Sequence, residues 1–191
     1  MIEVRIHGRG GQGNVVAAYL LATAAFEEGR YGQAFPAFGA ERRGAPVTAF
    51  VRIAEAPIRR RCEVRQPAFL IIQDEALLRV PGVLDGLKSG GGILVNSARS
   101  GPALSAEHGR DMLSLPATAL AQEVLGRPVP NTALLAAFLT LTDLLPRAAL
   151  VKALAERFSG KVLEKNTGLI ERASAMVAPG LWKETQHAAS A

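Results

Sequence analysis

The chain has 191 residues, 49% hydrophobic and 20% charged, which suits one soluble domain with its own core; no apolar run reaches the roughly 20 residues that span a bilayer. Its single cysteine excludes an internal disulfide and an iron–sulfur cluster, which needs about four thiolates, and its three scattered histidines show no metal-ligand spacing. The net charge of +5 is uneven, because residues 1–65 hold ten arginines, no lysine and six acids; this predicts an anionic ligand or partner there, unless the excess is a solvated basic surface.

The N-terminal third is predicted to combine strands with one long helix. Apolar and polar side chains alternate over residues 2–7, which predicts a strand, and an Ala- and Leu-rich helix over 12–28 follows it. Residues 57–67 include three consecutive arginines and are predicted to form an exposed turn. Two further strands are predicted at residues 33–35 and 47–53.

The rest of the chain alternates short apolar runs with helical patterns. Residues 69–73 are predicted to form a strand buried on both faces, and Asp74 to cap a short helix ending at Leu78. Asn131 is expected to cap a long apolar helix, and Pro146 to occupy the first turn of the next one. Strands are predicted at 93–95 and 113–115, and helices at 118–125, 131–141, 146–158 and 161–176.

This succession of elements predicts the fold class. Short strands alternating with helices indicate an α/β protein, a single-domain three-layer α/β/α sandwich with a largely parallel, Rossmann-like sheet. We assign residues 1–182 to the domain and residues 183–191 to a flexible polar tail. The first residues show no signal peptide, so we expect a cytoplasmic location.

A glycine-rich loop follows the first predicted strand and opens the first helix. Residues 8–13 have the sequence GRGGQG, which matches G-x-G-x-x-G. Glycines allow a tight turn and a close approach of phosphate to the backbone, and the helix N-terminus supplies N–H groups and partial positive charge. A simple strand-to-helix turn explains the same pattern. No acid for ribose hydroxyls occurs at residues 31–40, which argues against an NAD-dependent dehydrogenase.

Residues 35–46 are the most distinctive stretch of the sequence. Two aromatics, two prolines, two glycines and the pair Arg42-Arg43 lie within twelve residues, FPAFGAERRGAP. An arginine pair facing a glycine loop would suit a diphosphate or another ligand with several negative charges. A solvated arginine pair beside a core phenylalanine is the alternative.

These two stretches together resemble the gamma subunit of pyruvate and 2-oxoisovalerate:ferredoxin oxidoreductases, on residues 8–13 and 35–53. The sequence RRGAP at residues 42–46, where the 2-oxoglutarate branch usually carries Met-Arg-Gly-Gly, favours the pyruvate-like branch. The resemblance covers about residues 1–178 and takes in Asp74 after a buried strand, the glycine-rich approach to Asn96, and Asn131-Thr132 before an apolar helix.

The resemblance implies a role in a multi-subunit enzyme. Such enzymes decarboxylate a 2-oxoacid on thiamine diphosphate, pass electrons through iron–sulfur clusters to ferredoxin, and deliver the acyl group to coenzyme A (CoA). It places thiamine diphosphate and the clusters on the alpha, beta and delta subunits or their fused equivalents. This chain is then a structural and CoA-docking subunit, with no catalytic residue and no metal of its own.

A contact set for CoA follows from that implied role. The glycine loop at a helix N-terminus suits the diphosphate, and the arginine pair suits the remaining phosphate charge, out of about four negative charges in all. The predicted CoA contacts are Gly10, Gly11, Gln12, Gly13, Arg42, Arg43 and Asn96.

The roles of Asp74 and Glu75, and two other functions of the chain, remain as alternatives. Asp74 and Glu75 follow a central strand, where active-site acids often occur, although a helix cap beside a solvated glutamate explains them more simply. The chain could be a stand-alone nucleotide-binding Rossmann-like module or a small reductase. It could also be a basic RNA-binding protein, but no RNA-binding fingerprint appears, so we expect no nucleic-acid partner.

Overall fold

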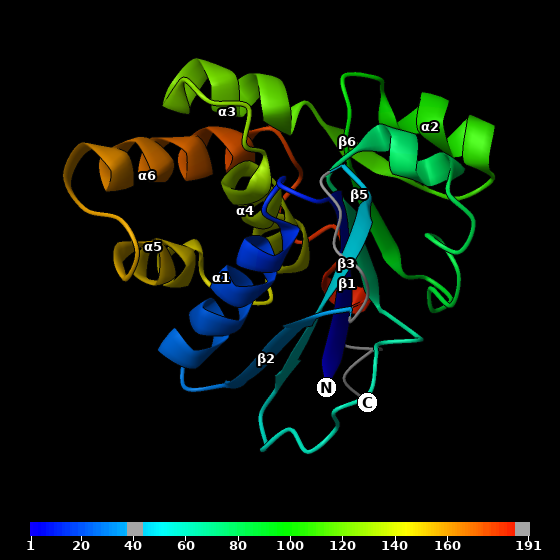
Figure 1. Ribbon diagram of the computed structural model, residues 1–191, viewed down its shortest axis with the longest axis horizontal. Helices are drawn as coiled ribbons and strands as arrows, with labels where there is room; N and C mark the ends of the chain where they lie inside the picture. Colours follow the sequence, from blue (N-terminus) through cyan, green and yellow to red (C-terminus); the bar gives the residue numbers. More distant parts are fainter. Residues whose placement is uncertain (38–43, 186–191) are drawn as a thin grey trace.

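The computed structural model describes residues 1–37 and 44–185, so Arg42 and Arg43 lie outside the described residues. Its centre is one six-stranded mixed sheet with the order β2-β3-β1-β4-β5-β6 (Figure 1). β1, β4, β5 and β6 run parallel, whereas β3 pairs antiparallel with both β1 and β2. The strands are β1 Ile2–Arg9, β2 Tyr31–Pro36, β3 Pro46–Ala54, β4 Phe69–Ile72, β5 Gly92–Asn96 and β6 Leu113–Leu115.

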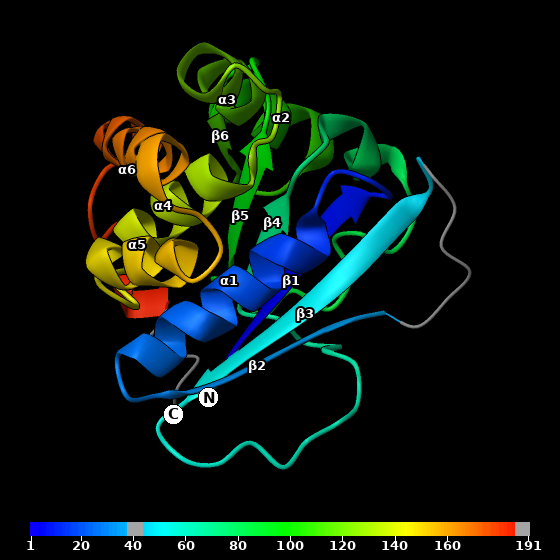
Figure 2. The ribbon, with the colours of Figure 1, turned by 60° about the vertical axis from the view of Figure 1, so that its left-hand side comes forward.

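Helices cover both faces of the sheet unequally, and the predicted α/β class with a largely parallel sheet is confirmed. The larger layer packs its apolar side chains on one face, where α1, α4, α5 and α6 lie together (Figure 2). It consists of α1 Asn14–Glu27, α3 Ala117–Leu125, α4 Asn131–Thr142, α5 Arg147–Ala155 and α6 Gly160–Ala175. The smaller layer consists of the 3-10 helix η1 Glu75–Arg79 and of α2 Gly101–His108.

The two apolar cores follow directly from the alternation of side chains along β4. Phe69 and Ile71 face the larger helical layer, while Leu70 and Ile72 face η1 and α2, so all four are buried. Phe69 meets Phe138 of α4 edge-on at 5.3 Å between ring centroids and stacks on Trp182 at 5.8 Å. The parallel strands are therefore fixed from both sides, which holds the residues that follow them in place.

One helix was not predicted, and two local predictions differ from the structure. The sequence analysis left out α2, in which Ser100 accepts the N–H of Ala103 and caps a helix that begins at Gly101. Pro146 precedes the first residue of α5 instead of lying in its first turn. Asn131 begins α4 but makes no capping bond.

The C-terminal segment begins with contacts to the body of the domain. Lys183 pairs with Asp143 at 2.8 Å, and the Thr185 hydroxyl donates to the Gly90 carbonyl at 2.9 Å. The division between a domain over 1–182 and a tail over 183–191 stays a prediction, since residues 186–191 lie outside the described part. Within that part, no helix has the length and apolar character needed to cross a bilayer.

Candidate functional site

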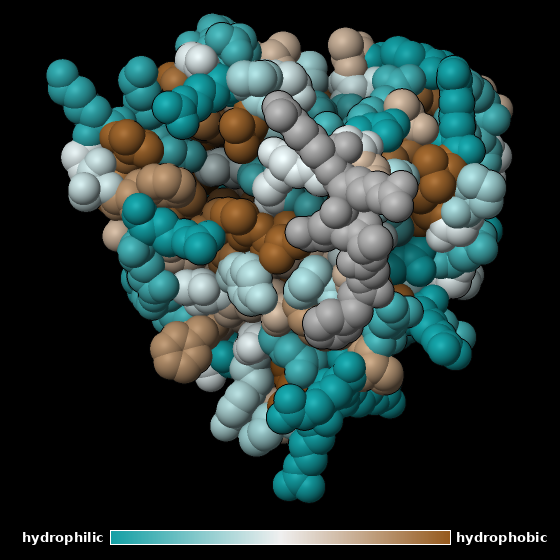
Figure 3. Space-filling view, in the orientation of Figure 1, coloured by the Kyte–Doolittle hydropathy of each residue, from teal (hydrophilic) through white to brown (hydrophobic). Residues whose placement is uncertain are grey.

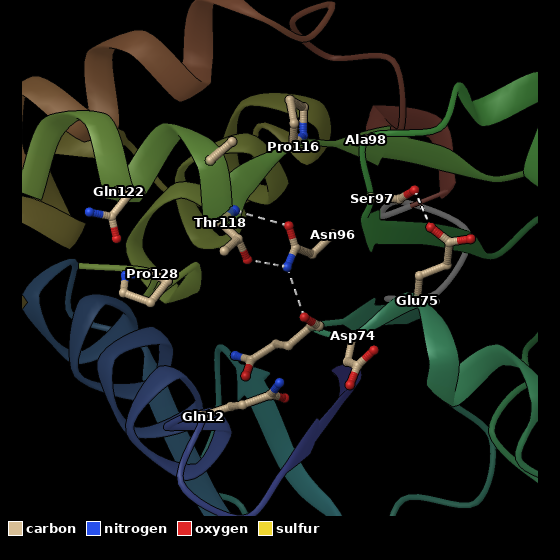
Figure 4. A pocket seen from close by; sticks show the side chains of 12 residues that line it. Gln12, Asp74, Glu75, Asn96, Ser97, Ala98, Pro116, Thr118, Gln122 and Pro128 are labelled. Atoms are coloured by element: carbon tan, nitrogen blue, oxygen red, sulfur yellow. Dashed lines mark hydrogen bonds between the residues drawn. The ribbon is translucent and has the colours of Figure 1, made fainter. Parts of the chain in front are cut away.

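The sheet topology places a crevice at the carboxyl ends of the parallel strands. β1 leads to α1 on one face of the sheet, whereas its neighbour β4 leads to η1 on the other. Ligands of open α/β sheets bind where neighbouring connections diverge in this way. A cavity of about 610 Å³ lies there (Figure 4), lined by Gln12, Gln73, Asp74, Glu75, Asn96, Ser97, Ala98, Pro116, Thr118, Ala119, Gln122 and Pro128.

The glycine loop forms the side of this crevice next to α1, and its amides divide into two groups. The N–H of Gly10 donates to the Ala45 carbonyl at 2.9 Å, and the N–H of Gln12 donates to the Arg9 carbonyl at 2.9 Å. The N–H groups of Gly11 and Gly13 have no acceptor among the described residues. The loop therefore offers the Gly11 and Gly13 amides and the start of α1 to an anion, while Gly10 and Gln12 shape it.

Glycine is required at two positions of this loop for different reasons. Gly11 has φ +92°, with open space where a side chain would begin, so only the backbone conformation demands glycine. Gly13 has φ +76°, and a Cβ there would lie 2.6 Å from Nδ2 of Asn131. The loop is thus packed against α4 at Gly13 and open to solvent at Gly11.

Gln73 and Asn131 connect the loop to the centre of the sheet. Nε2 of Gln73 donates to Oδ1 of Asn131 at 2.9 Å, and Nδ2 of Asn131 donates to the Gly13 carbonyl at 2.9 Å. The prediction that Asn131 caps α4 is therefore wrong, because its amide is used across three elements. Oε1 of Gln73 is buried and has no partner among the described residues, although Gln73 lines the cavity. It lies against β1, since a Cβ at Gly8 would be 2.9 Å from it, so this oxygen is enclosed by the protein and does not face the cavity.

Asn96, predicted as a ligand contact, lines the cavity at the end of β5. Its Nδ2 donates to the Gln73 carbonyl at 2.9 Å and to the Thr118 hydroxyl at 2.7 Å, and its Oδ1 accepts the Thr118 N–H at 3.1 Å. Figure 4 shows these bonds between the two walls of the cavity. Asn96 thus holds the start of α3 against β4 and β5, and its contact with a ligand stays a prediction.

The opposite wall carries two carboxylates, each paired with an arginine. Asp74 accepts the N–H of Ala76 at 2.9 Å, which confirms its predicted capping role, and it also pairs with Arg9. Glu75 accepts from Ser97 and from Arg99, the latter at 2.9 Å. The hydrogen bond from Ser97, followed by that from Arg99, lowers the pKa of Glu75. Both acids therefore have a compensating arginine, and its lowered pKa keeps Glu75 ionised, an arrangement unlike that of a proton-transferring acid.

Asp74 does not replace the ribose-binding acid that the sequence lacks at residues 31–40. In a dinucleotide fold that acid follows the second strand, on the side of the first strand away from the crevice. Here β4, which Asp74 follows, lies on the crevice side of β1, and β2 is an antiparallel edge strand beyond β3. The Asp74 carboxylate is instead paired with Arg9.

Comparison with known proteins identifies the family. The model of the pyruvate ferredoxin/flavodoxin oxidoreductase family matches residues 3–176. The chain belongs to this family. The resemblance seen in its glycine and arginine loops is thereby confirmed.

Members of the pyruvate ferredoxin/flavodoxin oxidoreductase family include close relatives of the chain. The pyruvate/ketoisovalerate oxidoreductases common subunit gamma of Thermococcus kodakarensis is 47% identical over 177 residues, 91% of this chain and 95% of that protein. The crystal structure of the pyruvate oxidoreductase subunit PORC of Thermotoga maritima superposes with a TM-score of 0.82 and 34% identity, over 91% of this chain and 95% of that one.

A more distant structure shares the fold alone. The 2-oxoglutarate:ferredoxin oxidoreductase of Magnetococcus marinus, solved with 2-oxoglutarate, coenzyme A and succinyl-CoA bound, aligns with a TM-score of 0.73 and 19% identity. The alignment covers 92% of this chain but 30% of that one, so the same domain occurs there within a much longer chain.

The structure brings together some of the residues predicted for this family member and adds others. Gln12 and Asn96 both line the cavity, and the glycines lie beside it. Arg42 and Arg43 lie outside the described residues, but the described Gly44 donates its N–H to the Gly10 carbonyl at 3.2 Å. The sequence analysis missed Gln73, Ser97, Thr118 and Gln122 as lining residues.

Proposed function

We propose that this chain is the gamma subunit of a pyruvate-type 2-oxoacid:ferredoxin oxidoreductase and helps to dock CoA in the assembled enzyme. Its 47% identity to a subunit gamma shared by pyruvate and ketoisovalerate oxidoreductases, along nearly the whole of both chains, supports the subunit role. The CoA role rests on one observation above all, the cavity at the strand ends beside which the loop amides of Gly11 and Gly13 are free.

The chemistry of the cavity suggests how CoA would lie. Asp74 and Glu75 make their wall unsuitable for phosphates, whereas amide and hydroxyl groups suit a neutral, amide-bearing portion of the molecule. The exposed amide of Gln122, which lines the cavity, would bond to that portion. The diphosphate would lie at Gly11, Gly13 and the start of α1, on the side from which the loop carrying Arg42 and Arg43 emerges.

This subunit would bind and orient, and other chains would carry out the redox chemistry. The entire sequence contains one cysteine, Cys62, so an iron–sulfur cluster with about four thiolate ligands does not fit this chain. Thiamine diphosphate and the clusters would be held by alpha, beta and delta partners, and electrons would pass to ferredoxin from those subunits. The cytoplasmic location expected from the sequence stays a prediction.

Purification of the assembled enzyme tests the subunit role. The chain would be tagged in its source cells, purified, and assayed for CoA-dependent reduction of a viologen dye with pyruvate, 2-oxoisovalerate and 2-oxoglutarate. We expect activity with pyruvate, together with co-purifying partner chains. An inactive single chain that binds NAD or ATP tightly would instead identify the stand-alone nucleotide-binding module.

Substitutions in the assembled enzyme test the CoA site. Gln122→Ala removes an exposed amide from the cavity wall without touching the Gln73–Asn131 bridge, and the double variant Arg42→Ala/Arg43→Ala removes the predicted phosphate contacts. Each is expected to raise the apparent KM for CoA about tenfold, while kcat at saturating CoA changes little. The double variant Arg147→Ala/Arg157→Ala, two exposed arginines at the ends of α5 that do not line the cavity, is the control. An unchanged KM in both test variants would remove this cavity from the CoA site.

A further inference from the structure

The segment between β3 and β4 is an ordered, arginine-rich loop that the proposed CoA site does not use. Residues 55–68 contain four arginines and two glutamates. The loop lies at the end of the sheet opposite the cavity, at the lower end of the molecule in Figure 1, and hydrophilic side chains project at this end in Figure 3. Arg59, Arg60, Arg61 and Arg65 are all exposed.

A buried guanidinium holds this loop in place. The side chain of Arg52 on β3 is 1% exposed and pairs with Glu3 at 2.7 Å. It donates to the carbonyl of Arg60 at 3.3 Å and to that of Cys62 at 2.6 Å, and it lies over the ring of Phe35. Burying a charge is costly unless it is fully paired, so this cluster fixes the loop backbone with its carbonyls turned inward.

The remainder of the loop is anchored along its length. Val64 is buried, and the Ala68 N–H donates to the Glu3 carbonyl at 2.8 Å. The Pro67 carbonyl accepts the Lys88 N–H at 3.0 Å. At Gly86 a Cβ would lie 2.0 Å from the Arg65 carbonyl, so two loops are in close backbone contact there. The loop is thus fixed by its backbone, and its arginine side chains are left to solvent.

The charges of this loop are not balanced within the described part of the chain. Arg59, Arg60, Arg61 and Arg65 form no ion pair with any described carboxylate, whereas Glu55 at the start of the loop pairs with Arg30. Residues 57–65 carry four guanidinium groups against one carboxylate, Glu63, so the loop has a net positive charge that a complementary acidic surface would neutralise.

We infer that this loop, residues 57–65, docks an acidic surface of a partner subunit. A resident subunit fits better than a soluble electron carrier, because this chain has one cysteine and cannot hold the cluster from which electrons would leave. Arginine is suited to such contacts, since its planar guanidinium forms paired hydrogen bonds to carboxylates. The inference rests on one part of the proposed function, that the chain is a subunit of a larger assembly, and it does not depend on the CoA site.

Photo-cross-linking in the assembled complex identifies the occupant. A photo-reactive amino acid would be placed at position 61 or, as the control, at position 157, an exposed arginine just after α5. Cross-linked peptides would be identified by mass spectrometry. We expect position 61 to cross-link to a segment of another subunit that is rich in Asp and Glu. Cross-links to nucleic acid, to a soluble carrier, or to this chain alone would overturn the inference.

Charge reversal tests the energetics of the same contact. The triple variant Arg59→Glu/Arg60→Glu/Arg61→Glu is compared with Arg127→Glu/Arg147→Glu/Arg157→Glu, which changes the net charge equally at exposed arginines elsewhere. Partner chains that co-purify are quantified at low and high salt. We expect at least one partner chain to co-purify with the loop variant in an amount at least tenfold lower than with the wild type. We also expect less of that chain to co-purify with the wild type at high salt. Equal recovery from both variants would overturn the inference, and far-ultraviolet circular dichroism of each variant checks its folding.

The outcome separates this inference from the proposed function. If the cavity variants leave the KM for CoA unchanged while the charge-reversed loop loses a partner chain, only the CoA site is refuted. Normal CoA dependence together with full assembly of the charge-reversed loop would refute the docking loop alone.

Discussion

Nε2 of Gln73 donates to Oδ1 of Asn131 at 2.9 Å, and through this one bond the end of β4 is tied to the start of α4. Asn131 also binds the glycine loop, because its Nδ2 donates to the Gly13 carbonyl. Both side chains are buried, Gln73 at 1% and Asn131 at 6% exposure. Three elements that are far apart in sequence thus meet at one amide pair beside the cavity.

Replacing Asn131 by Ala is expected to destabilise the chain by about 2 kcal/mol, because it leaves the buried Gln73 amide and the Gly13 carbonyl unpaired. Urea unfolding of the full chain measures the free energy. Gln122→Ala, which truncates an exposed amide lining the same cavity, is the control and should cost under about 0.5 kcal/mol. Equal effects of the two variants would show that the bridge contributes little.

The spacing of apolar residues was sufficient to predict most elements, because burial of one or both faces of a strand or helix determines which positions are apolar. β1, β4, β5 and β6 lie where they were predicted, within a few residues at each end. The pattern does not tell which strands are neighbours. The antiparallel pair β2 and β3 lies outside the parallel strands, so the contact between β1 and β4 could not be read from their order along the chain.

The site was predicted in outline, and the details depended on tertiary contacts. The glycine loop and Asn96 were predicted from local sequence, and both lie at the crevice. Gln73 was taken as the end of a buried strand, and nothing local distinguishes an amide that bonds a residue 58 positions away. Likewise, the use of the Gly10 amide by Ala45 depends on a loop that folds back on the first one.

Gly11→Ala and Gly13→Ala separate backbone strain from packing within one loop. Both glycines have positive φ, so each alanine should cost about 1 kcal/mol in strain. Gly13→Ala also brings a Cβ within 2.6 Å of Asn131 Nδ2 and disturbs the amide bridge, so we expect about 3 kcal/mol in total. Thermal unfolding of both variants measures the difference. A larger loss for Gly11→Ala would contradict the packing described for the loop.

Arg52→Met tests the buried guanidinium under the arginine-rich loop. The substitution leaves Glu3 without its partner and releases the carbonyls of Arg60 and Cys62, so we expect a loss of about 3–5 kcal/mol. Arg172→Met, which breaks the exposed pair with Glu123, is the matched control and should cost under about 1 kcal/mol. Urea unfolding provides both values, and a small effect at Arg52 would mean that the loop is held by other contacts.

His7 predicts how stability depends on pH. Its side chain on β1 is buried at 7% exposure, and burial, followed by repulsion from Arg5, lowers the pKa of His7 to about 3. Between about pH 6.5 and that value the unfolded chain binds a proton that the folded chain does not. The free energy of unfolding should therefore fall with decreasing pH, by up to about 1.4 kcal/mol per pH unit from this one group.

His7→Gln is expected to remove this slope between pH 6.5 and 4.5, a window chosen to lie above the range in which Glu75 contributes. The pKa of Glu75 is lowered from 4.5, so its stabilisation is present above that pH and is lost only as the pH falls further. Urea unfolding of both proteins at several pH values in the window gives the two slopes. If the wild-type chain and His7→Gln lose stability in parallel, His7 is protonated in the folded state, and another group causes the acid sensitivity.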